Sequence, residues 1–310
     1  MAADRTGIIL KGVGGLYTVY SENAQYECRL RGSLRLGGIT PVTGDRVVLE
    51  NDANTGTPAV ISSVLPRKNV LVRPKAANID KLVLVIASLS PAPDLMLVDK
   101  LLVCAEREGI GSVLVVNKAD QDEKAASEIA GQYRFAAKCF VTKAFDPENH
   151  GLDGLFPLLE GSTCVLAGQS GVGKSTILNL LTDGAFMATG DISEKTLRGR
   201  HTTRHAELFP VSSRYVSRPS FVIDSPGFSL FELENTAPRD LPGYYPEVYN
   251  HQGECRFQDC SHTGEPGCFV PGLVHGGLFH PERYERYKKL YRELELKEKN
   301  KYRKSNKNGG

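Results

Sequence analysis

The chain has 310 residues, of which 41% are hydrophobic and 24% charged, a composition ordinary for folded globular domains. A net charge of +2 does not by itself indicate a nucleic-acid binder, and no apolar run approaches the roughly 20 residues of a membrane span. The seven cysteines are odd in number and the chain begins without an apolar signal segment, so we expect reduced thiols and a cytoplasmic protein.

Residues 1–68 are predicted to form an OB-like β-barrel. Five short runs of strand-forming residues alternate with glycine-rich turns, and they are Thr6–Leu10, Leu16–Tyr20, Tyr26–Leu30, Arg46–Glu50 and Ala59–Val64. Five strands in this length fit an OB fold, which often binds oligonucleotides. Four arginines are candidates for an RNA-binding face, with a solvated basic strand surface as the alternative: Arg29, Arg31, Arg35 and Arg46.

An α/β pattern follows over residues 69–232. Leu82–Ala87 and Ser112–Val116 are predicted to be buried strands, and Asn117-Lys118-Ala119-Asp120 stands at the carboxyl end of the second, where ligands bind in open α/β sheets. The Asp120 carboxylate can accept from N1–H and the exocyclic amine of guanine, whereas adenine presents the opposite polarity. Alone, this N-K-x-D pattern can be a polar turn. A helix over 123–133 and a strand over 139–141 lead to Thr142 and Lys143, which we assign to nucleotide binding as well.

A phosphate-binding loop is predicted after the apolar run Thr163–Ala167. Its pattern, G-x-x-x-x-G-K-[ST], consists of Gly168, Gln169, Ser170, Gly171, Val172, Gly173, Lys174, Ser175 and Thr176. Strand, glycine loop and helix together aim backbone N–H groups at a phosphate. Lys174 supplies charge for the β and γ oxygens, and the Ser175 hydroxyl is a ligand for Mg²⁺. The alternative is a glycine-rich turn that matches the pattern by chance. The predicted strand before it and helix after it favour the phosphate-binding loop.

The polar stretch from 182 to 205 is longer than ordinary connections, so we expect it to be functional. It contains His201, Thr202 and Thr203; either threonine can close over the γ-phosphate, and we assign Thr203 to Mg²⁺. Two further strands are predicted over 206–209 and 220–223, and the second leads into Asp224-Ser225-Pro226-Gly227. In this D-x-x-G pattern Asp224 would hold Mg²⁺ through water and Gly227 would sense the γ-phosphate.

Residues 233–310 are predicted to form a zinc-binding domain with helices. Three thiolates and one imidazole occur within 14 residues, a set suited to one structural Zn²⁺: Cys255, Cys260, His262 and Cys268. His251, His275 and His280 are possible substitutes for His262, and buried free thiols are the alternative to a metal site. A basic helix is expected from Pro281, with a stripe of Tyr284, Tyr287, Tyr291 and Leu294, ending in a frayed tail over 297–304 that suits phosphate backbones or merely solubilises the chain.

These motifs together resemble the Ras-like GTPases with one departure. The usual order is P-loop, switch threonine, D-x-x-G and N-K-x-D, whereas here N-K-x-D precedes the P-loop, as in a circularly permuted GTPase. With the OB-like domain and the Cys/His cluster, the chain resembles the ribosome small-subunit-dependent GTPase A family of bacteria. The resemblance implies a monomeric GTPase that needs Mg²⁺ with GTP, binds no membrane, and contacts the small ribosomal subunit and its rRNA. It implies late subunit maturation, with subunit-stimulated hydrolysis of GTP to GDP and phosphate.

Phe228 stands where many Ras-like enzymes place a water-orienting glutamine, and it cannot polarise water. His201 is the candidate replacement by resemblance, since a neutral imidazole can orient or accept from water; the alternative is a histidine that contacts phosphate or RNA. Two other functions stay open. One is an RNA-binding module whose nucleotide only regulates docking, and the other is an ATP-dependent kinase, against which Asp120 argues.

Overall fold

The protein is described by a computed structural model over residues 5–36, 38, 40–51, 58–72, 75–146, 150–185, 206–224, 233 and 236–307. The chain divides into two compact units, residues 1–85 with 143–230 and residues 86–142 with 231–310. Each unit is made of two separate stretches of chain, so each closes only when segments far apart in the sequence meet. Within the described residues, no helix is both long enough and apolar enough to cross a membrane.

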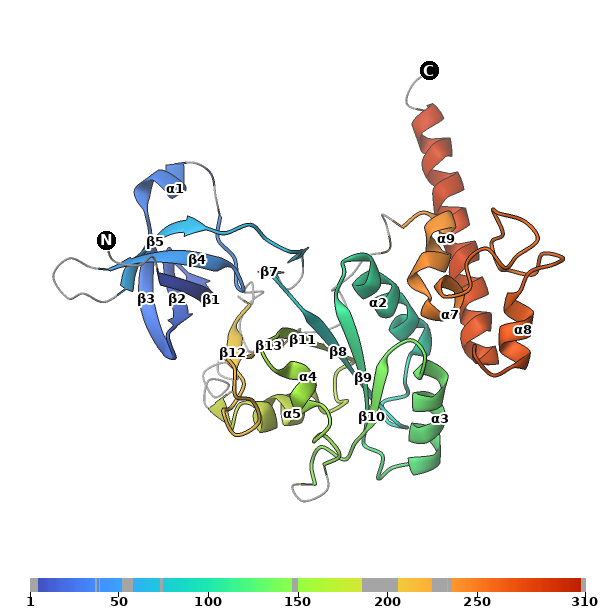
Figure 1. The fold of residues 1–310 in the computed structure, drawn as a ribbon, viewed down its shortest axis with the longest axis horizontal. Helices are drawn as coiled ribbons and strands as arrows, with labels where there is room; N and C mark the ends of the chain where they lie inside the picture. Colours follow the sequence, from blue (N-terminus) through green and yellow to red (C-terminus); the bar gives the residue numbers. More distant parts are fainter. Residues whose placement is uncertain are drawn as a thin grey trace. The chain divides into compact units, whose positions relative to one another are not determined.

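The first unit begins with a closed five-stranded barrel, which confirms the predicted architecture (Figure 1). Its strands, in the order β1-β2-β3-β5-β4, are β1 (Arg5–Val13), β2 (Leu16–Ser21), β3 (Ala24–Leu30), β4 (Arg46–Asn51) and β5 (Pro58–Val64). Two hairpins turn on Gly14-Gly15 and Glu22-Asn23, all four at the positive φ that tight two-residue turns require. Parallel pairing of β3 with β5 completes the barrel. A short helix that was not predicted, α1 (Gly32–Leu36), follows β3.

The barrel is filled by inward-facing apolar residues: Ile9, Val19, Cys28, Val47, Leu49 and Ile61. The chain leaves the barrel through Arg67, whose guanidinium donates at 2.7 and 2.9 Å to the two carboxylate oxygens of the fully buried Asp45. Charge-assisted bidentate bonds of this kind are among the strongest hydrogen bonds, so they fix the start of the connecting segment. That segment forms a two-stranded sheet, β6 (Val70–Leu71) with β7 (Ala76–Ala77).

A six-stranded sheet has the order β10-β9-β8-β11-β13-β12. The strands are β8 (Lys81–Ala87), β9 (Gly111–Asn117), β10 (Lys138–Val141), β11 (Thr163–Ala167), β12 (Leu208–Pro210) and β13 (Phe221–Asp224). β8, β11 and β13 run parallel, as do β9 and β10, whereas β12 is antiparallel to β13. β11 is buried along its whole length, as its apolar run predicts for a strand covered on both faces.

Among the described residues, four helices connect these strands: α2 (Leu95–Arg107), α3 (Glu123–Tyr133), α4 (Phe156–Leu159) and α5 (Lys174–Leu181). Aspartate side chains start the first two, because Asp94 accepts from the Leu97 N–H and Asp122 from the Ala125 N–H. α3 has the predicted bounds. Its cap stands two residues after Asp120, so the N-K-x-D loop runs directly into an anchored helix.

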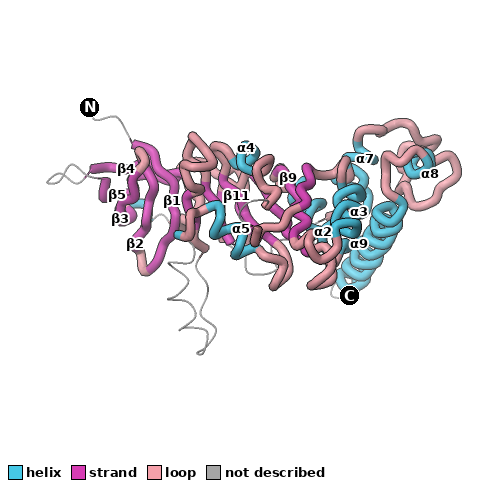
Figure 2. The backbone as a smooth tube through the Cα atoms, turned by 90° about the horizontal axis from the view of Figure 1, so that it is seen from below, coloured by secondary structure: helices cyan, strands magenta, loops and turns pink. Residues whose placement is uncertain are grey.

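The second unit ends in a helical region of η2 (Pro238–Tyr244), α7 (Pro246–Tyr249), α8 (Val270–His275) and α9 (Pro281–Lys307). The predicted stripe on α9 is confirmed, with Tyr284, Tyr287 and Leu294 buried in an apolar cluster and Tyr291 packed at its edge. The predicted frayed tail over 297–304 was wrong, since the backbone of α9 stays helical to Lys307 (Figure 2). Ion pairs one turn apart, from Glu293 to Lys297 and from Glu295 to Lys299, favour the longer helix.

A buried cluster of charges fastens α9 to α2 and α7 within this unit. Arg283 is 1% exposed and donates to Asp99 of α2 at 2.9 Å and to Glu247 of α7. Arg286 donates to the second oxygen of the same Asp99 carboxylate. The Arg283 guanidinium also lies over the Tyr245 ring, 4.8 Å from its centroid. Buried charges persist only when paired in this way, so Arg283 is expected to be indispensable to the packing.

Arg283→Met should lower the free energy of unfolding by about 3–5 kcal/mol, because it leaves the buried Glu247 carboxylate without its cation. The matched control is Arg239, whose side chain is 88% exposed beside Asp240; Arg239→Met should change that free energy by less than about 0.5 kcal/mol. Urea unfolding followed by tyrosine fluorescence measures both, since the chain has 12 tyrosines and no tryptophan. Equal losses from the two variants would contradict the assignment.

Candidate functional site

The predicted glycine loop lies between β11 and α5, in the expected strand, loop and helix order. Gly168 approaches β8 so closely that a Cβ atom there would lie 2.1 Å from the Val85 carbonyl oxygen, so only glycine fits. Gly171 and Gly173 have φ of +81° and +99°, in the left-handed region that favours glycine. The buried Val172 anchors the loop from below. Its exposed residues are Ser170, Gly171, Ser175 and Thr176.

Lys174 folds its side chain back into this loop. Its ammonium group donates to the carbonyl oxygens of Gly168 at 2.7 Å and Gln169 at 2.9 Å. Burial lowers the pKa of Lys174, and the nearby Asp224 carboxylate acts in the opposite direction. Asp224 ends β13 opposite Leu166 of β11. A cation, a helix N-terminus and a carboxylate therefore surround one loop, an arrangement suited to a phosphate with its metal ion.

Four predicted residues lie outside the described residues: His201, Thr202, Thr203 and Gly227. Asp224 is the last described residue of the D-x-x-G pattern. The roles assigned to these four residues stay predictions.

The N-K-x-D loop begins where β9 ends, in the second unit. The Asn117 side chain is buried, and its carbonyl oxygen accepts from the Thr142 hydroxyl at 3.0 Å. Thr142 also accepts from the Ala119 N–H through its own carbonyl at 3.1 Å, so this threonine braces the loop twice. The Asp120 carboxylate is exposed. The structure thus brings Thr142 to the loop and leaves the Asp120 carboxylate exposed.

Lys143 is the first residue of the later stretch of the first unit. Its N–H donates to the His150 carbonyl at 3.1 Å, and its carbonyl accepts from the Asp146 N–H at 2.8 Å. These bonds hold the Lys143 backbone in a closed turn. Its assignment to nucleotide binding stays a prediction.

Sequence reasoning missed a second loop that supports the N-K-x-D residues. Ser88, directly after β8, donates its hydroxyl to the Lys118 carbonyl at 2.6 Å. Lys118 donates its ammonium to the Ser90 carbonyl at 3.0 Å, and Gln121 accepts from the Ser90 N–H at 2.9 Å. The sequence did contain a signal for this loop, because Ser88 is the polar residue that ends the apolar run Leu82–Ala87.

The predicted metal ligands converge in the second unit. The ligand atoms of Cys255, Cys260, His262 and Cys268 all lie within 4.8 Å of one another, close enough for one ion. His262 Nδ1 lies 3.4 Å from Cys255 Sγ and 3.5 Å from Cys268 Sγ, so the imidazole faces the thiols. Burial lowers the pKa of His262, which favours the neutral imidazole that binds metals. Three sulfurs and one nitrogen are the donor set of structural zinc.

The cluster is held by bonds that the sequence did not reveal. Although burial opposes it, hydrogen bonds from the Ser261 hydroxyl and from the Ser261 and Thr263 N–H groups lower the pKa of Glu265 to about 2. Tyr284 of α9 donates its hydroxyl to the His262 carbonyl at 2.9 Å, and Tyr287 donates to the Ser261 carbonyl at 2.7 Å. The ligand loop is therefore fastened to the buried face of α9.

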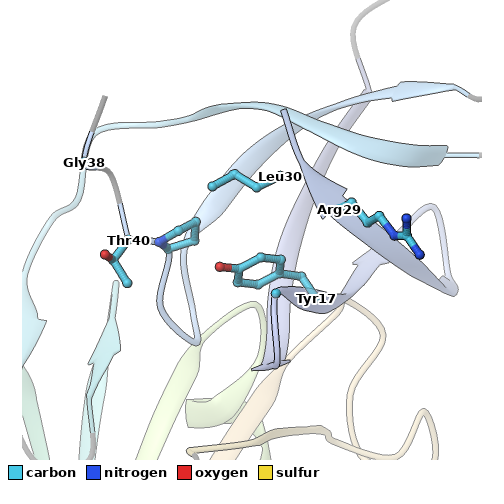
Figure 3. Close-up of a pocket in the computed structure, with 7 residues that line it drawn as sticks. Tyr17, Arg29, Leu30, Gly38 and Thr40 are labelled. Carbon is cyan, nitrogen blue, oxygen red and sulfur yellow. The ribbon is translucent and has the colours of Figure 1, made fainter. Parts of the chain in front are cut away.

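The barrel carries a shallow hollow of about 300 Å³. It is lined by Gly15, Tyr17, Arg29, Leu30, Gly38, Thr40 and Pro41. Figure 3 shows the Tyr17 ring with Thr40 to one side, Arg29 to the other and Leu30 above it. Aromatic rings and arginines on a barrel surface are the groups that stack bases and contact phosphates. Of the other predicted arginines, Arg46 is exposed and Arg31 is paired with Glu50 at 2.6 Å.

Comparison with known proteins finds two family models, "RsgA GTPase" over residues 64–234 and "RsgA N-terminal domain" over residues 6–58. Relatives named small ribosomal subunit biogenesis GTPase RsgA include one from Ruminiclostridium cellulolyticum, 42% identical over 93% of both chains, and one from Agathobacter rectalis, 38% identical over 95% of this chain and 99% of its own. Among solved structures, YjeQ from Thermotoga maritima is 33% identical with a TM-score of 0.76, covering 94% of this chain and 98% of its own. YloQ, described as a circularly permuted GTPase, is 29% identical with a TM-score of 0.75, covering 95% and 96%.

Proposed function

The chain belongs to the RsgA GTPase family, and we propose that it hydrolyses GTP to GDP and phosphate while it assists late maturation of the small ribosomal subunit. The observation that carries the proposal is the formed phosphate loop, whose Lys174 ammonium already lies among the loop carbonyls. The exposed Asp120 at the end of an N-K-x-D loop supports guanine as the base. The names of the relatives support the ribosomal subunit as the partner.

We assign binding to two groups of residues. The phosphates and Mg²⁺ would be held by residues 168–176 with Asp224 and, from the segment between 186 and 205, Thr202 and Thr203. The base would be held by Asn117, Lys118 and Asp120, with Thr142 as their brace. Ser175 and Thr203 are the proposed Mg²⁺ ligands, and the ion neutralises charge that develops on the phosphates when it is bound with GTP.

We assign rRNA contact to two surfaces. One is the hollow beside Tyr17 and Arg29 on the barrel. The other is the later part of α9, since nine Lys and Arg stand against three Glu between 288 and 307, beyond the buried and paired Arg283 and Arg286. Positive groups on both surfaces would contact the phosphate backbone, which makes the affinity fall with salt.

Guanine recognition is tested at Asp120. Asp120→Asn should lose affinity for GTP and gain affinity for xanthosine triphosphate, because xanthine presents an acceptor where guanine presents its exocyclic amine. Titration of both nucleotides against parent and variant measures the exchange. Unchanged affinity of the variant for GTP would refute the role of Asp120.

We propose that the Cys/His cluster binds one structural Zn²⁺. Metal analysis of the full-length protein should find about one zinc per chain, and Cys260→Ser should lower that content because it removes one of four donors. Cys139→Ser is the matched control, since the Cys139 thiol is bonded to the Ala137 carbonyl away from the cluster and its loss should leave the zinc content unchanged. Equal zinc in all three proteins would contradict the site.

Subunit-stimulated turnover tests the proposed activity as a whole, and His201→Ala tests the proposed water-orienting group. GTP hydrolysis by the parent should rise when small subunits are added. The variant should bind GTP nearly as well but lose about 10²–10⁴-fold of the stimulated rate, the usual contribution of a positioned acid–base group. Co-sedimentation of the variant with subunits and a non-hydrolysable GTP analogue must show that docking is intact.

These assays also separate the alternatives. Subunit binding by the parent without stimulated turnover would favour a nucleotide-regulated RNA-binding module. A variant that docks and hydrolyses GTP at the parent rate would show that a group other than His201 orients the water.

A further inference from the structure

We propose that Ser88 and Gln121 are positioning residues for guanine recognition, acting through Lys118. The inference rests on the proposed function, because it assumes that the N-K-x-D loop binds the base. Neither residue belongs to the N-K-x-D pattern, and Ser88 lies on a different loop 30 positions earlier in the chain. All the contacts involved lie within the second unit.

Ser88 holds two consecutive peptide groups of the base-binding loop. Its N–H donates to the Asn117 carbonyl at 2.9 Å, and its hydroxyl donates to the Lys118 carbonyl at 2.6 Å. The Ser88 residue is only 3% exposed, so water does not readily replace the hydroxyl. Ser88 therefore fixes the direction of the chain where β9 ends and the loop begins.

This support matters because Lys118 has a φ of +60°, a left-handed conformation that a residue with a side chain rarely adopts. Such a conformation persists only where the surroundings determine it. Here the Lys118 carbonyl is held from both sides, by the Ser88 hydroxyl and by the Gln121 N–H at 2.9 Å. Relaxation of Lys118 would turn the following peptide groups, and with them the direction of Asp120.

Gln121 positions the ammonium end of Lys118 through Ser90. Its side-chain carbonyl accepts from the Ser90 N–H at 2.9 Å, while the Ser90 carbonyl accepts from the Lys118 ammonium at 3.0 Å. Both backbone groups of Ser90 are thus engaged by side chains of the N-K-x-D loop and its next residue. The Lys118 side chain is thus fixed at its ammonium end as well as at its backbone. A stem held at both ends offers a fixed apolar surface on which a flat base can lie.

The test measures the dissociation constant and dissociation rate of fluorescent GDP, and the affinity for a non-hydrolysable GTP analogue, on the full-length protein. Ser88→Ala and Gln121→Ala should each weaken both nucleotides by about three- to tenfold, the effect of losing one hydrogen bond, mainly through faster dissociation. GDP and the GTP analogue should lose affinity by the same factor, because the substitutions affect the contacts with guanine, which both nucleotides share. Ser88→Thr and Gln121→Glu keep the hydroxyl and the acceptor oxygen, so they should restore most of the affinity.

A control separates positioning from general stability. Ser220 is 1% exposed and its hydroxyl also makes two hydrogen bonds, accepting from the Gly161 N–H and donating to the Arg218 carbonyl, at the amino end of β13. Ser220→Ala should lower the melting temperature as much as Ser88→Ala while leaving GDP affinity unchanged. A double-mutant cycle adds a second check, since in a Lys118→Met background Gln121→Ala should have no further effect.

The outcomes distinguish this inference from the function on which it rests. A parent protein that binds adenine nucleotides as tightly as guanine nucleotides would overturn both. A parent that prefers guanine, together with Ser88→Ala and Gln121→Ala variants of parent affinity, would overturn the positioning role alone. Weakened binding that Ser88→Thr and Gln121→Glu fail to restore would also overturn it, since the bonds named here would then not be the cause.

Discussion

The parallel pairing of β8 with β11 is the contact on which the central sheet depends. It joins strands far apart in the chain, since the Thr163 N–H donates at 2.9 Å to the Asp80 carboxylate, 83 positions earlier. Closing so long a loop costs conformational entropy, which the burial of two apolar strands offsets. At the other end of the pair, Gly168 meets the Val85 carbonyl with no room for a side chain. The phosphate loop is therefore shaped by the strand pairing itself.

The same two strands lead into residues of the candidate site. Beyond its carboxyl end β11 continues into the glycine loop, and β8 continues into Ser88, which supports Lys118. β13, the other neighbour of β11, ends at Asp224. Residues at the carboxyl ends of parallel strands lie where open α/β sheets bind their ligands. The carboxyl ends of neighbouring strands in this sheet therefore carry the glycine loop, Ser88 and Asp224.

Local signals predicted most of this fold, and long-range contacts account for what was missed. The bounds of α3 agree with the helix predicted over 123–133, and the barrel strands were placed to within a few residues between their glycine-rich turns. The bonds from Ser88 to Lys118 and from Arg283 to Asp99 span 30 and 184 positions. No periodicity in the sequence reports such pairs. The five-residue α1 was missed for the opposite reason, since so short a helix leaves no periodic pattern to read.

In the sequence, each predicted γ-phosphate sensor precedes a described residue that contacts an element proposed to contact rRNA. The segment with Thr202 and Thr203 leads into Ala206 and Glu207, which are bound at 2.8 Å each by Thr43 and Lys11 of the barrel. The segment with Gly227 leads to Leu233, which is buried in the apolar cluster around α9. In the usual order the D-x-x-G segment would instead continue toward the strand that corresponds to β8. For the D-x-x-G segment, permutation therefore places the α9 region next in the chain, whereas the order from Thr203 to the strand at 208–210 is the same as in the usual arrangement.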